Sequence, residues 1–352
     1  ILRAKALRMT RSFFIAMTID ITNELGVIMQ GNGQIIRVII VSFLIALFLG
    51  PVVIPVLKRL KVGQSIREDG PKSHLAKSGT PTMGGIIIIL AILTSIITGR
   101  LITKEVLAVI FFMLGFGLIG AIDDYKKVVM RQNEGLKPYQ KIVGQLIFSV
   151  LLAWYGSRYS AMKTALMIPF VNMHIDLGVL YIPFITFIAV GTVNAVNLTD
   201  GLDGLNTGVT LIVMAAFSLI ANSLKETNQI YEGISLICAA TSGACLGFLK
   251  HNANPAKVFM GDIGSLALGG VVSSVAVLSG MVLFIPIIGG IYLVEALSVI
   301  IQVFHYKRTK RRVFKMAPLH HHFEMCGWKE TKVVSAFWIA TLILAFIGIY
   351  SI

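Results

Sequence analysis

The chain has 352 residues, of which 56% are hydrophobic and 14% are charged, and its mean hydropathy is +0.82. Soluble domains carry about 25% charged residues, so this composition excludes an ordinary soluble protein and indicates an all-α integral membrane protein. The net charge of +14 would suggest nucleic acid in a soluble protein, but here it suggests anionic lipid headgroups or a phosphorylated ligand, with no nucleic acid.

The first 34 residues differ from the remainder of the chain. They mix four basic residues with apolar ones, and we expect a processed or added end to which we assign no function. Residues 35–352 are expected to form a single polytopic domain.

Ten apolar runs approach the roughly 20 residues that a membrane-spanning helix needs. They lie near residues 36–57, 82–99, 105–122, 141–156, 177–196, 205–222, 233–249, 263–280, 281–304 and 333–351. The eighth and ninth runs meet at Gly280, and the ninth contains Pro286 and two glycines, so we expect it to bend. Residues 164–177, between the fourth and fifth runs, alternate in polarity and predict a small periplasmic hairpin.

The distribution of basic residues predicts the orientation of these spans. The odd-numbered loops contain 21 Lys and Arg residues, whereas the even-numbered loops contain 5. The positive-inside rule therefore places the five odd loops in the cytoplasm and both termini outside. Every cluster of polar side chains that could bind a ligand or catalyse a reaction falls in an odd-numbered loop. This distribution predicts one cytoplasmic site built from five loops.

The first and third loops carry the first two clusters. The stretch "SHLAKSGTPTMGG" resembles a P-loop but lacks the Lys-Ser/Thr pair after its glycines. We therefore expect Lys77 and Thr82 only to donate hydrogen bonds to a phosphate. Asp123 and Asp124 end the third span. At the C-terminal end of a helix, the helix dipole destabilises each carboxylate by roughly 0.3–1 kcal/mol. A solvated helix end is the alternative, but a metal ion or cationic ligand would stabilise both charges.

The fifth loop, in "NAVNLTDGLDGLNTG", places Asn197, Asp200 and Asp203 at three-residue spacing, which is one face of a helix. Capping of the following helix is the alternative, and it would explain one of the two acids. Since this loop contains no Lys or Arg, we expect the acids to bind a ligand.

The seventh loop contains "FMGDIGS" just before the eighth span. Asp262 could cap that span, but the neighbouring small residues would also let a phosphate approach backbone N–H groups at a helix N-terminus. Phe259 could stack on a nucleobase or simply pack.

The ninth loop contains a run of three histidines, His320, His321 and His322, together with basic residues between 308 and 315. A segment that binds anionic lipids at the membrane surface is the alternative. Imidazoles beside so much positive charge suit a phosphate better than a metal ion. Glu295 lies inside the ninth span and indicates a cavity or a partner, without a role that we can assign.

Clustered carboxylates provide oxygen ligands, and such ligands favour Mg²⁺, with Mn²⁺ as the second choice. The basic loops favour a multiply charged anion. Together they predict phosphoryl transfer to or from a lipid at the cytoplasmic face.

Five stretches occur in the order found in bacterial phospho-N-acetylmuramoyl-pentapeptide transferases: "SHLAKSGTPTMGG", "IDDY", "NAVNLTDGLDGL", "FMGDIGSLALGG" and "PLHHHFE". From about residue 36 to 351 the chain resembles this family, part of the polyprenyl-phosphate N-acetylhexosamine-1-phosphate transferase superfamily. The resemblance implies transfer of phospho-N-acetylmuramoyl-pentapeptide from its UDP-linked precursor to undecaprenyl phosphate, giving lipid I and UMP in peptidoglycan synthesis. It also implies ten transmembrane helices, a Mg²⁺ requirement and a place in the bacterial plasma membrane. It is compatible with a homodimer.

The resemblance further implies roles for individual residues. Catalytic roles fall to Asp123, Asp124 and Asp262, with Asp262 also the metal ligand, and contacts on the phosphate side fall to His320, His321 and His322. Other active-site positions are Lys77, Thr82, Asn197, Asp200 and Asn252, and the uracil pocket corresponds to Asp203 and Phe259.

The mechanism and two other functions stay open at this level. Either an Asp attacks the diphosphate to give a covalent intermediate, or the lipid phosphate attacks directly, which we favour. A sibling enzyme that transfers GlcNAc-1-phosphate to the same lipid is the first alternative function. An anion or ion-coupled transporter is a distant one, since the acids lie at span ends rather than at mid-membrane.

Overall fold

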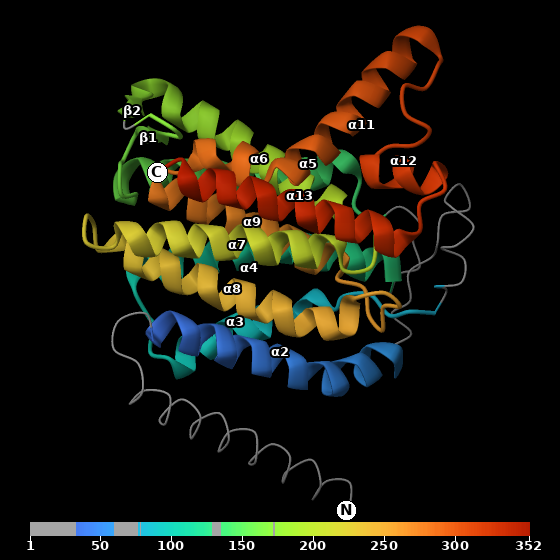
Figure 1. Cartoon of the computed structure of the whole chain (residues 1–352), viewed down its shortest axis with the longest axis horizontal. Helices are drawn as coiled ribbons and strands as arrows, with labels where there is room; N and C mark the ends of the chain where they lie inside the picture. Colours follow the sequence, from blue (N-terminus) through green and yellow to red (C-terminus); the bar gives the residue numbers. More distant parts are fainter. Residues whose placement is uncertain (1–32, 60–76, 78, 129–134, 172) are drawn as a thin grey trace, which may run out of the picture.

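The computed structural model describes residues 33–59, 77, 79–128, 135–171 and 173–352. Long helices lie roughly parallel in one bundle, and α11 projects from it at an angle (Figure 1). The long helices are α2 (Gly33–Arg59), α3 (Gly85–Thr98), α4 (Lys104–Val128), α5 (Pro138–Tyr159), α6 (Tyr181–Thr199), α7 (Leu205–Leu224), α8 (Ile230–Asn252), α9 (Gly261–Ser279), α11 (Gly290–Thr309) and α13 (Glu330–Tyr350). The short elements are β1 (Ala165–Ile168), β2 (Met173–Asp176), η2 (Gly178–Leu180), η3 (Val282–Phe284), α10 (Ile285–Ile288) and α12 (Leu319–Met325).

Nine of the ten apolar runs each coincide with one described long helix, whereas the run 281–304 covers η3, α10 and most of α11. Seven helices in the described part are long and apolar enough to cross a membrane, and an eighth span results if the bent pair η3–α10 and α11 is counted as one. The protein is therefore a multi-pass membrane protein. The count of ten spans stays a prediction, because α3 has only 14 residues and α5 does not reach the same apolarity.

Three local predictions are confirmed. Gly280 ends α9 in the left-handed conformation with φ of 75°, which only glycine adopts without strain. The ninth span breaks between α10 and α11 with a bend of 83°. Strands β1 and β2 form an antiparallel hairpin in which Ala165 pairs with Asp176.

Small residues bring α3 and α4 close to α9 at the level of the predicted site. A Cβ on Gly120 of α4 would stand 2.1 Å from the carbonyl oxygen of Asp262, and one on Gly85 of α3 would stand 2.2 Å from the Cα of Gly264. Glycine at these positions therefore permits backbone contact between helices, as is common in membrane bundles.

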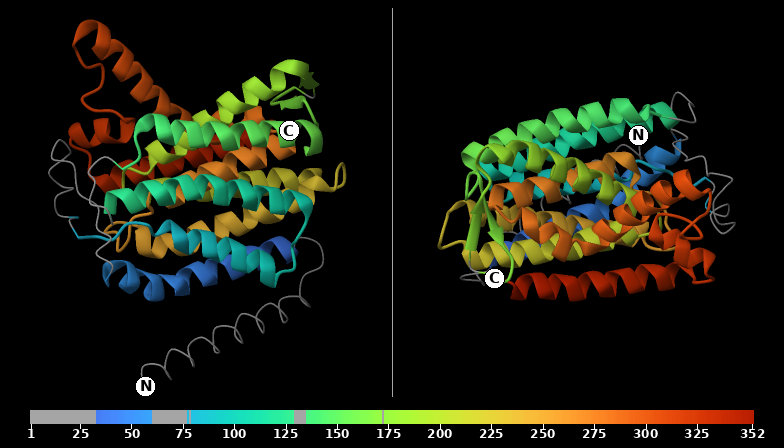
Figure 2. Two further views of the ribbon diagram at one scale, coloured as in Figure 1. Left: turned by 180° about the vertical axis from the view of Figure 1, so that it is seen from behind. Right: turned by 90° about the horizontal axis from the view of Figure 1, so that it is seen from above.

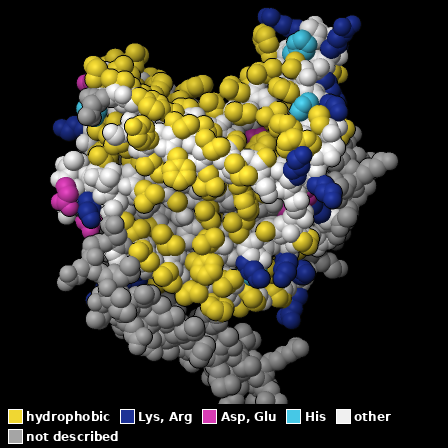
Figure 3. Space-filling model, in the orientation of Figure 1, with side chains coloured by type: hydrophobic (Ala, Val, Ile, Leu, Met, Phe, Trp, Pro, Cys, Tyr) yellow, Lys and Arg dark blue, Asp and Glu magenta, His cyan; other side chains and the backbone are white. Residues whose placement is uncertain are grey.

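Apolar side chains cover much of the face seen in Figure 3, and basic side chains gather toward one end of it. Several large apolar side chains are exposed, among them Phe187 and Phe346. Exposed apolar side chains of this kind face hydrocarbon when they belong to a spanning helix.

The two ends of the bundle differ in chemistry. The hairpin and the C-terminus lie at one end, whereas α12 and the tip of α11 lie at the other (Figures 1 and 2). At the hairpin end, the backbone N–H of Phe170 donates to the carbonyl of Ser351 at 2.8 Å. The predicted site residues lie at the α12 end.

The native cysteines provide a test of the predicted orientation. Cys326, at the end of α12, is exposed, whereas Cys238 and Cys245 are buried. If the α12 end is cytoplasmic, a membrane-impermeant thiol reagent should label Cys326 only after cells are permeabilised. A Val179→Cys variant should be labelled in intact cells, because Val179 is exposed at the hairpin end. Strong labelling of Cys326 from outside would contradict the orientation.

Candidate active site

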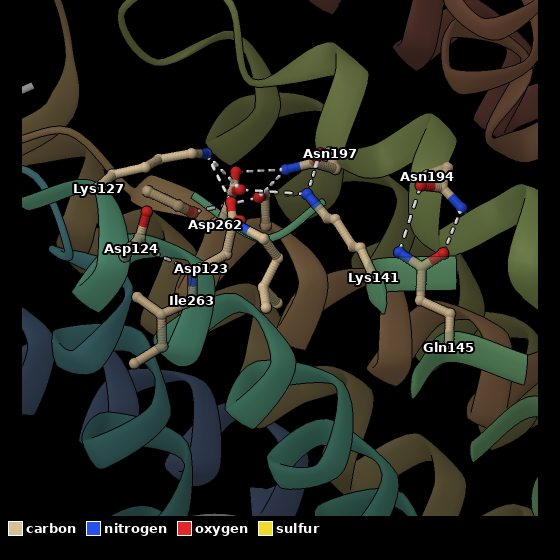
Figure 4. Close-up of polar contacts among 12 residues, drawn as sticks. Asp123, Asp124, Lys127, Lys141, Gln145, Asn194, Asn197, Asp262 and Ile263 are labelled. Atoms are coloured by element: carbon tan, nitrogen blue, oxygen red, sulfur yellow. Dashed lines mark hydrogen bonds and ion pairs between the residues drawn. The ribbon is translucent and has the colours of Figure 1, made fainter. Parts of the chain in front are cut away.

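Three aspartates from α4 and α9 form the centre of the site, which we call the acid cluster: Asp123, Asp124 and Asp262 (Figure 4). Asp123 and Asp124 are almost fully buried. The backbone N–H of Leu136 donates to Asp123 Oδ1 at 2.6 Å, and that of Ile263 donates to Asp124 Oδ2 at 3.0 Å. These bonds fix both carboxylates at the end of the bundle.

Two lysines form ion pairs with Asp123 and Asp262 of the acid cluster. Lys127 Nζ lies 2.5 Å from Asp123 Oδ2 and 3.0 Å from Asp262 Oδ2, and Lys141 Nζ lies 3.1 Å from the same Asp262 oxygen. Figure 4 shows the two ammonium groups reaching Asp262 from opposite sides. A diphosphate drawn to this point would meet two cations and three carboxylates.

Asn197, at the end of α6, ties the fifth loop to the acid cluster. Its amide donates to Asp262 Oδ1 at 2.9 Å and to Ser265 Oγ at 2.7 Å, while its oxygen accepts from Lys141 Nζ at 3.2 Å. One turn away, Gln145 of α5 and Asn194 of α6 exchange amide hydrogen bonds of 2.7 and 3.2 Å (Figure 4). The pair holds α5 against α6, and Lys141 lies one turn from Gln145.

The first loop reaches the acid cluster through Thr82, which is buried. A Cβ on Gly261 would stand 2.7 Å from both Thr82 Oγ1 and Asp124 Oδ2, and Gly261 has a φ of 73°. Both the close approach and the positive φ require glycine at the start of α9.

The turn of residues 200–203 connects the acid cluster with the other predicted groups. Burial raises the pKa of Asp200 well above its usual range, and the negative charges of Asp262, Asp124 and Asp203 raise it further. A cation close to this turn would therefore favour the ionised form of Asp200.

Asp203 lies at a junction of four loops. Lys77 Nζ contacts Asp203 Oδ1 at 2.7 Å and Glu330 Oε1 at 2.6 Å. The Asn254 amide bridges Asp203 and Glu330 at 3.2 Å each, and the backbone N–H of Ala256 donates to Asp203 Oδ2 at 3.0 Å. The ion pair therefore holds Lys77 of the first loop beside Asp203 of the fifth.

His320 packs on the other side of the turn. A Cβ on Gly201 would stand 2.1 Å from His320 Nε2. The buried carboxylate of Glu295 accepts from the backbone N–H of His320 at 3.2 Å and contacts its Nδ1 at 3.1 Å. We assign the Nδ1 proton to that bond, which leaves Nε2, unpartnered among the described residues, facing the turn.

The other two histidines are engaged differently. His321 Nδ1 lies 2.8 Å from Glu324 Oε2, and His322 Nδ1 accepts from the backbone N–H of Lys315 at 3.1 Å. The three imidazoles therefore differ in their partners, and their contact with a phosphate stays a prediction.

Asn252 and Phe259 shape the seventh loop. Asn252 accepts from Thr207 Oγ1 at 2.6 Å and donates to the Val258 carbonyl at 3.1 Å, so its side chain joins α7 to the seventh loop. Phe259 is half-buried, and its backbone pairs with Pro81 and Gly84 of the first loop at 2.8 Å each. The two loops thus form one wall of the site.

Comparison with known proteins adds independent information. Residues 106–280 match the model of glycosyl transferase family 4, and residues 77–89 match signature 1 of phospho-N-acetylmuramoyl-pentapeptide-transferase. The phospho-N-acetylmuramoyl-pentapeptide-transferase of Alkaliphilus metalliredigens is 54% identical over 335 residues, which cover 92% of this chain and 100% of the relative. That of Clostridioides difficile is 51% identical, with coverage of 92% and 99%.

The chain belongs to the phospho-N-acetylmuramoyl-pentapeptide transferase family. The family signature begins at Lys77 and includes Thr82. The glycosyl transferase model includes the acid cluster and the whole turn of residues 200–203.

A divalent metal fits the donor chemistry of this family member, because the acid cluster and Asn197 offer the oxygen ligands that Mg²⁺ prefers. Within the described residues, however, no three acidic, His or Cys side chains are arranged as a ready metal site. Lys127 and Lys141 already contact the Asp262 carboxylate. A metal ion bound to Asp262 would therefore replace these lysine contacts rather than enter a ready set of ligands.

Three arguments from the sequence need correction. The acids are not without cations, because Lys127 contacts Asp123 within α4, and Lys77 and Lys141 reach Asp203 and Asp262 from other segments. Neither Asp203 nor Asp262 caps a helix, since the N-caps of α7 and α9 are Gly204 and Met260 without side-chain caps. Asp123 and Asp124 do not end their helix, which continues to Val128.

The sequence missed several residues of the site. The spacing of Asp123 and Lys127, four apart on one helix, could have identified that pair. Lys141, Asn194, Asn254 and Glu330 carried no comparable local signal, since their partners lie far away along the chain.

Proposed function

We propose that this protein transfers phospho-N-acetylmuramoyl-pentapeptide from its UDP-linked precursor to undecaprenyl phosphate, releasing UMP and forming lipid I. The strongest support is the acid cluster with its two lysines at one end of an apolar bundle, in a chain whose relatives carry the transferase name. We further propose that this end faces the cytoplasm of the bacterial plasma membrane, where the nucleotide substrate is soluble.

The reaction needs a nucleophile and neutralisation of charge. A phosphate monoester has a second pKa of about 6, so the lipid phosphate is mostly dianionic at neutral pH. One of its oxygens attacks the phosphorus that carries the sugar, the bond from that phosphorus to the bridging oxygen breaks, and UMP leaves with that oxygen. Asp123 takes any proton left on the acceptor.

The lysines of this chain then bind the diphosphate. Lys127 and Lys141 each lie within 3.1 Å of Asp262, so an arriving phosphate can exchange a carboxylate contact for its own. His320 presents Nε2 near the turn of residues 200–203. As an imidazolium, which carries a proton on each ring nitrogen, it would donate from Nε2 to a phosphate oxygen. These contacts position the two phosphates and stabilise the charge that moves to the leaving group.

A Mg²⁺ ion, or Mn²⁺ in its place, would be held by Asp262 with help from the other acids and Asn197. When bound, it would neutralise the diphosphate and polarise its oxygens.

A radiometric or coupled assay for UMP tests the proposal. Purified protein with undecaprenyl phosphate and Mg²⁺ should release UMP from the UDP-linked muramoyl-pentapeptide and form a lipid-linked product. Loss of all turnover on addition of a chelator, with recovery on Mg²⁺ or Mn²⁺, is expected. Transfer without any divalent ion would contradict the metal proposal but not the transferase.

The choice of sugar gives a second prediction. Both candidate donors share uridine, diphosphate and a hexosamine, so the acid cluster cannot distinguish them. At equal concentrations, the muramoyl-pentapeptide donor should be turned over much faster than UDP-GlcNAc, as measured by the ratio of initial rates. Comparable or faster turnover of UDP-GlcNAc would favour the sibling enzyme.

A further inference from the structure

A hollow of about 490 Å³ is lined by residues next to the β1–β2 hairpin. The hairpin lies at the end of the bundle opposite α12 (Figure 1). The end of α5, the turn into β1 and the start of α6 form its walls. The residues that matter here are Arg158, Lys163, Thr164, Val179, Tyr181 and Ile182. No residue of the candidate active site takes part.

An apolar groove of about 440 Å³ continues from this hollow along α5 and α6. Ile182 lines both spaces, so they adjoin. The groove is lined by the apolar side chains of Leu146 and Val150 of α5 and of Pro183, Phe187 and Val190 of α6. The polar group in its lining is the hydroxyl of Thr186, which is buried and unpartnered among the described residues.

The rim of the hollow is positively charged. Arg158 and Lys163 are exposed, and neither forms an ion pair within the described ranges. The neighbouring acid is Asp176 of β2, whose Oδ1 accepts from the Gly178 N–H at 3.0 Å. Hydrogen bonds from Gly178 and Thr164 hold the pKa of Asp176 below its usual range, so it stays ionised and leaves a rim with one net positive charge.

Lys163 occupies an unusual backbone position. Its φ is 55°, a left-handed conformation that costs a residue with a side chain about 1–2 kcal/mol and that glycine would adopt freely. The Ser160 hydroxyl donates to its carbonyl at 3.0 Å and helps to hold the turn. The turn therefore holds the backbone of Lys163 in one conformation at the rim of the hollow.

The surroundings of the groove are apolar. Phe187, within α6, is 74% exposed, which suits contact with hydrocarbon rather than water in a spanning protein. A ligand that reaches the groove therefore comes from the bilayer.

We propose that this end of the protein binds one anionic phospholipid, with its phosphate between Arg158 and Lys163 and one acyl chain along the α5–α6 groove. A free phosphate would gain nothing from the groove. The cationic headgroup of a zwitterionic lipid would be repelled by the rim. This site is independent of the proposed transferase reaction.

Native mass spectrometry of the full chain, purified in detergent with added phosphatidylglycerol, tests the proposal. The double variant R158Q/K163Q should retain phosphatidylglycerol on the order of tenfold less than the wild type, because each basic residue at an anionic surface contributes to binding. R100Q/K104Q is the matched control, since it removes the same charge from Arg100 in the loop before α4 and from Lys104, the first residue of α4, at the same end. It should retain the lipid like the wild type.

A second variant tests the groove separately. Ile182→Trp fills the junction of the two spaces, so it should lose phosphatidylglycerol although both charges remain. Unchanged retention in R158Q/K163Q, an equal loss in the control, or thermal protection by inorganic phosphate equal to that by phosphatidylglycerol would each overturn the proposal. UMP release by R158Q/K163Q in detergent that contains undecaprenyl phosphate and Mg²⁺ but no added phospholipid should match the wild type, which separates this test from that of the transferase.

Discussion

Replacing Asp262 by asparagine should reduce turnover by about 10²- to 10³-fold, the loss typical of removing one group that stabilises transition-state charge. Asp262 contacts Lys127, Lys141 and Asn197, so its charge organises both cations as well as any metal ion. The amide has the same shape, and the protein should therefore still fold and insert. The measurements are UMP release as a function of Mg²⁺ concentration and the thermal midpoint of unfolding.

Further variants and a trapping experiment extend this test of the acid cluster. Asp123→Asn and Asp124→Asn should also abolish most turnover, whereas Asp176→Asn, which changes an exposed acid at the hairpin end, should leave it unchanged. An Asp262→Asn enzyme with the wild-type Mg²⁺ dependence would exclude Asp262 as a metal ligand. Trapping a phosphorylated Asp with the UDP-linked donor alone would contradict direct attack by the lipid phosphate.

Replacing Glu295 by leucine should reduce turnover by about 10- to 100-fold, the usual effect of removing a group that orients a functional imidazole. Glu295 is fully buried and holds both the backbone N–H and Nδ1 of His320. Without it, His320 loses the partner that directs Nε2 toward Gly201. We therefore regard Glu295 as a positioning residue.

A double-mutant cycle separates positioning from a loss of stability. If Glu295 acts through His320, the variant E295L/H320N should be no slower than H320N alone, because the coupling is already lost. Glu295→Gln, which keeps a hydrogen-bond acceptor, should recover part of the rate. Fully additive losses in the cycle would show that Glu295 acts elsewhere, and Glu324→Gln provides a control at the neighbouring His321–Glu324 pair.

Much of this protein could be predicted from local patterns. Apolar run lengths placed every described long helix, since the bilayer thickness sets the length of a spanning segment. Glycine and proline marked the end of α9 and the break before α11, because their backbone preferences act locally. The motifs selected the acids, the turn of residues 200–203 and the histidine run, and comparison with relatives confirms the family that they indicated.

The tertiary structure decided which charges meet. Lys77 lies 126 positions from Asp203 and 253 positions from Glu330 along the chain, so no local spacing could pair them. The sequence argument for uncompensated acids was wrong for this reason: it counted cations only within one loop, whereas charges in a folded bundle are compensated across loops. Glu295 likewise gained a role only when the bend before α11 brought it to His320. Composition and helix length follow from the sequence alone because the bilayer acts on each segment separately, but the pairing of side chains at the site depends on how the segments pack against one another.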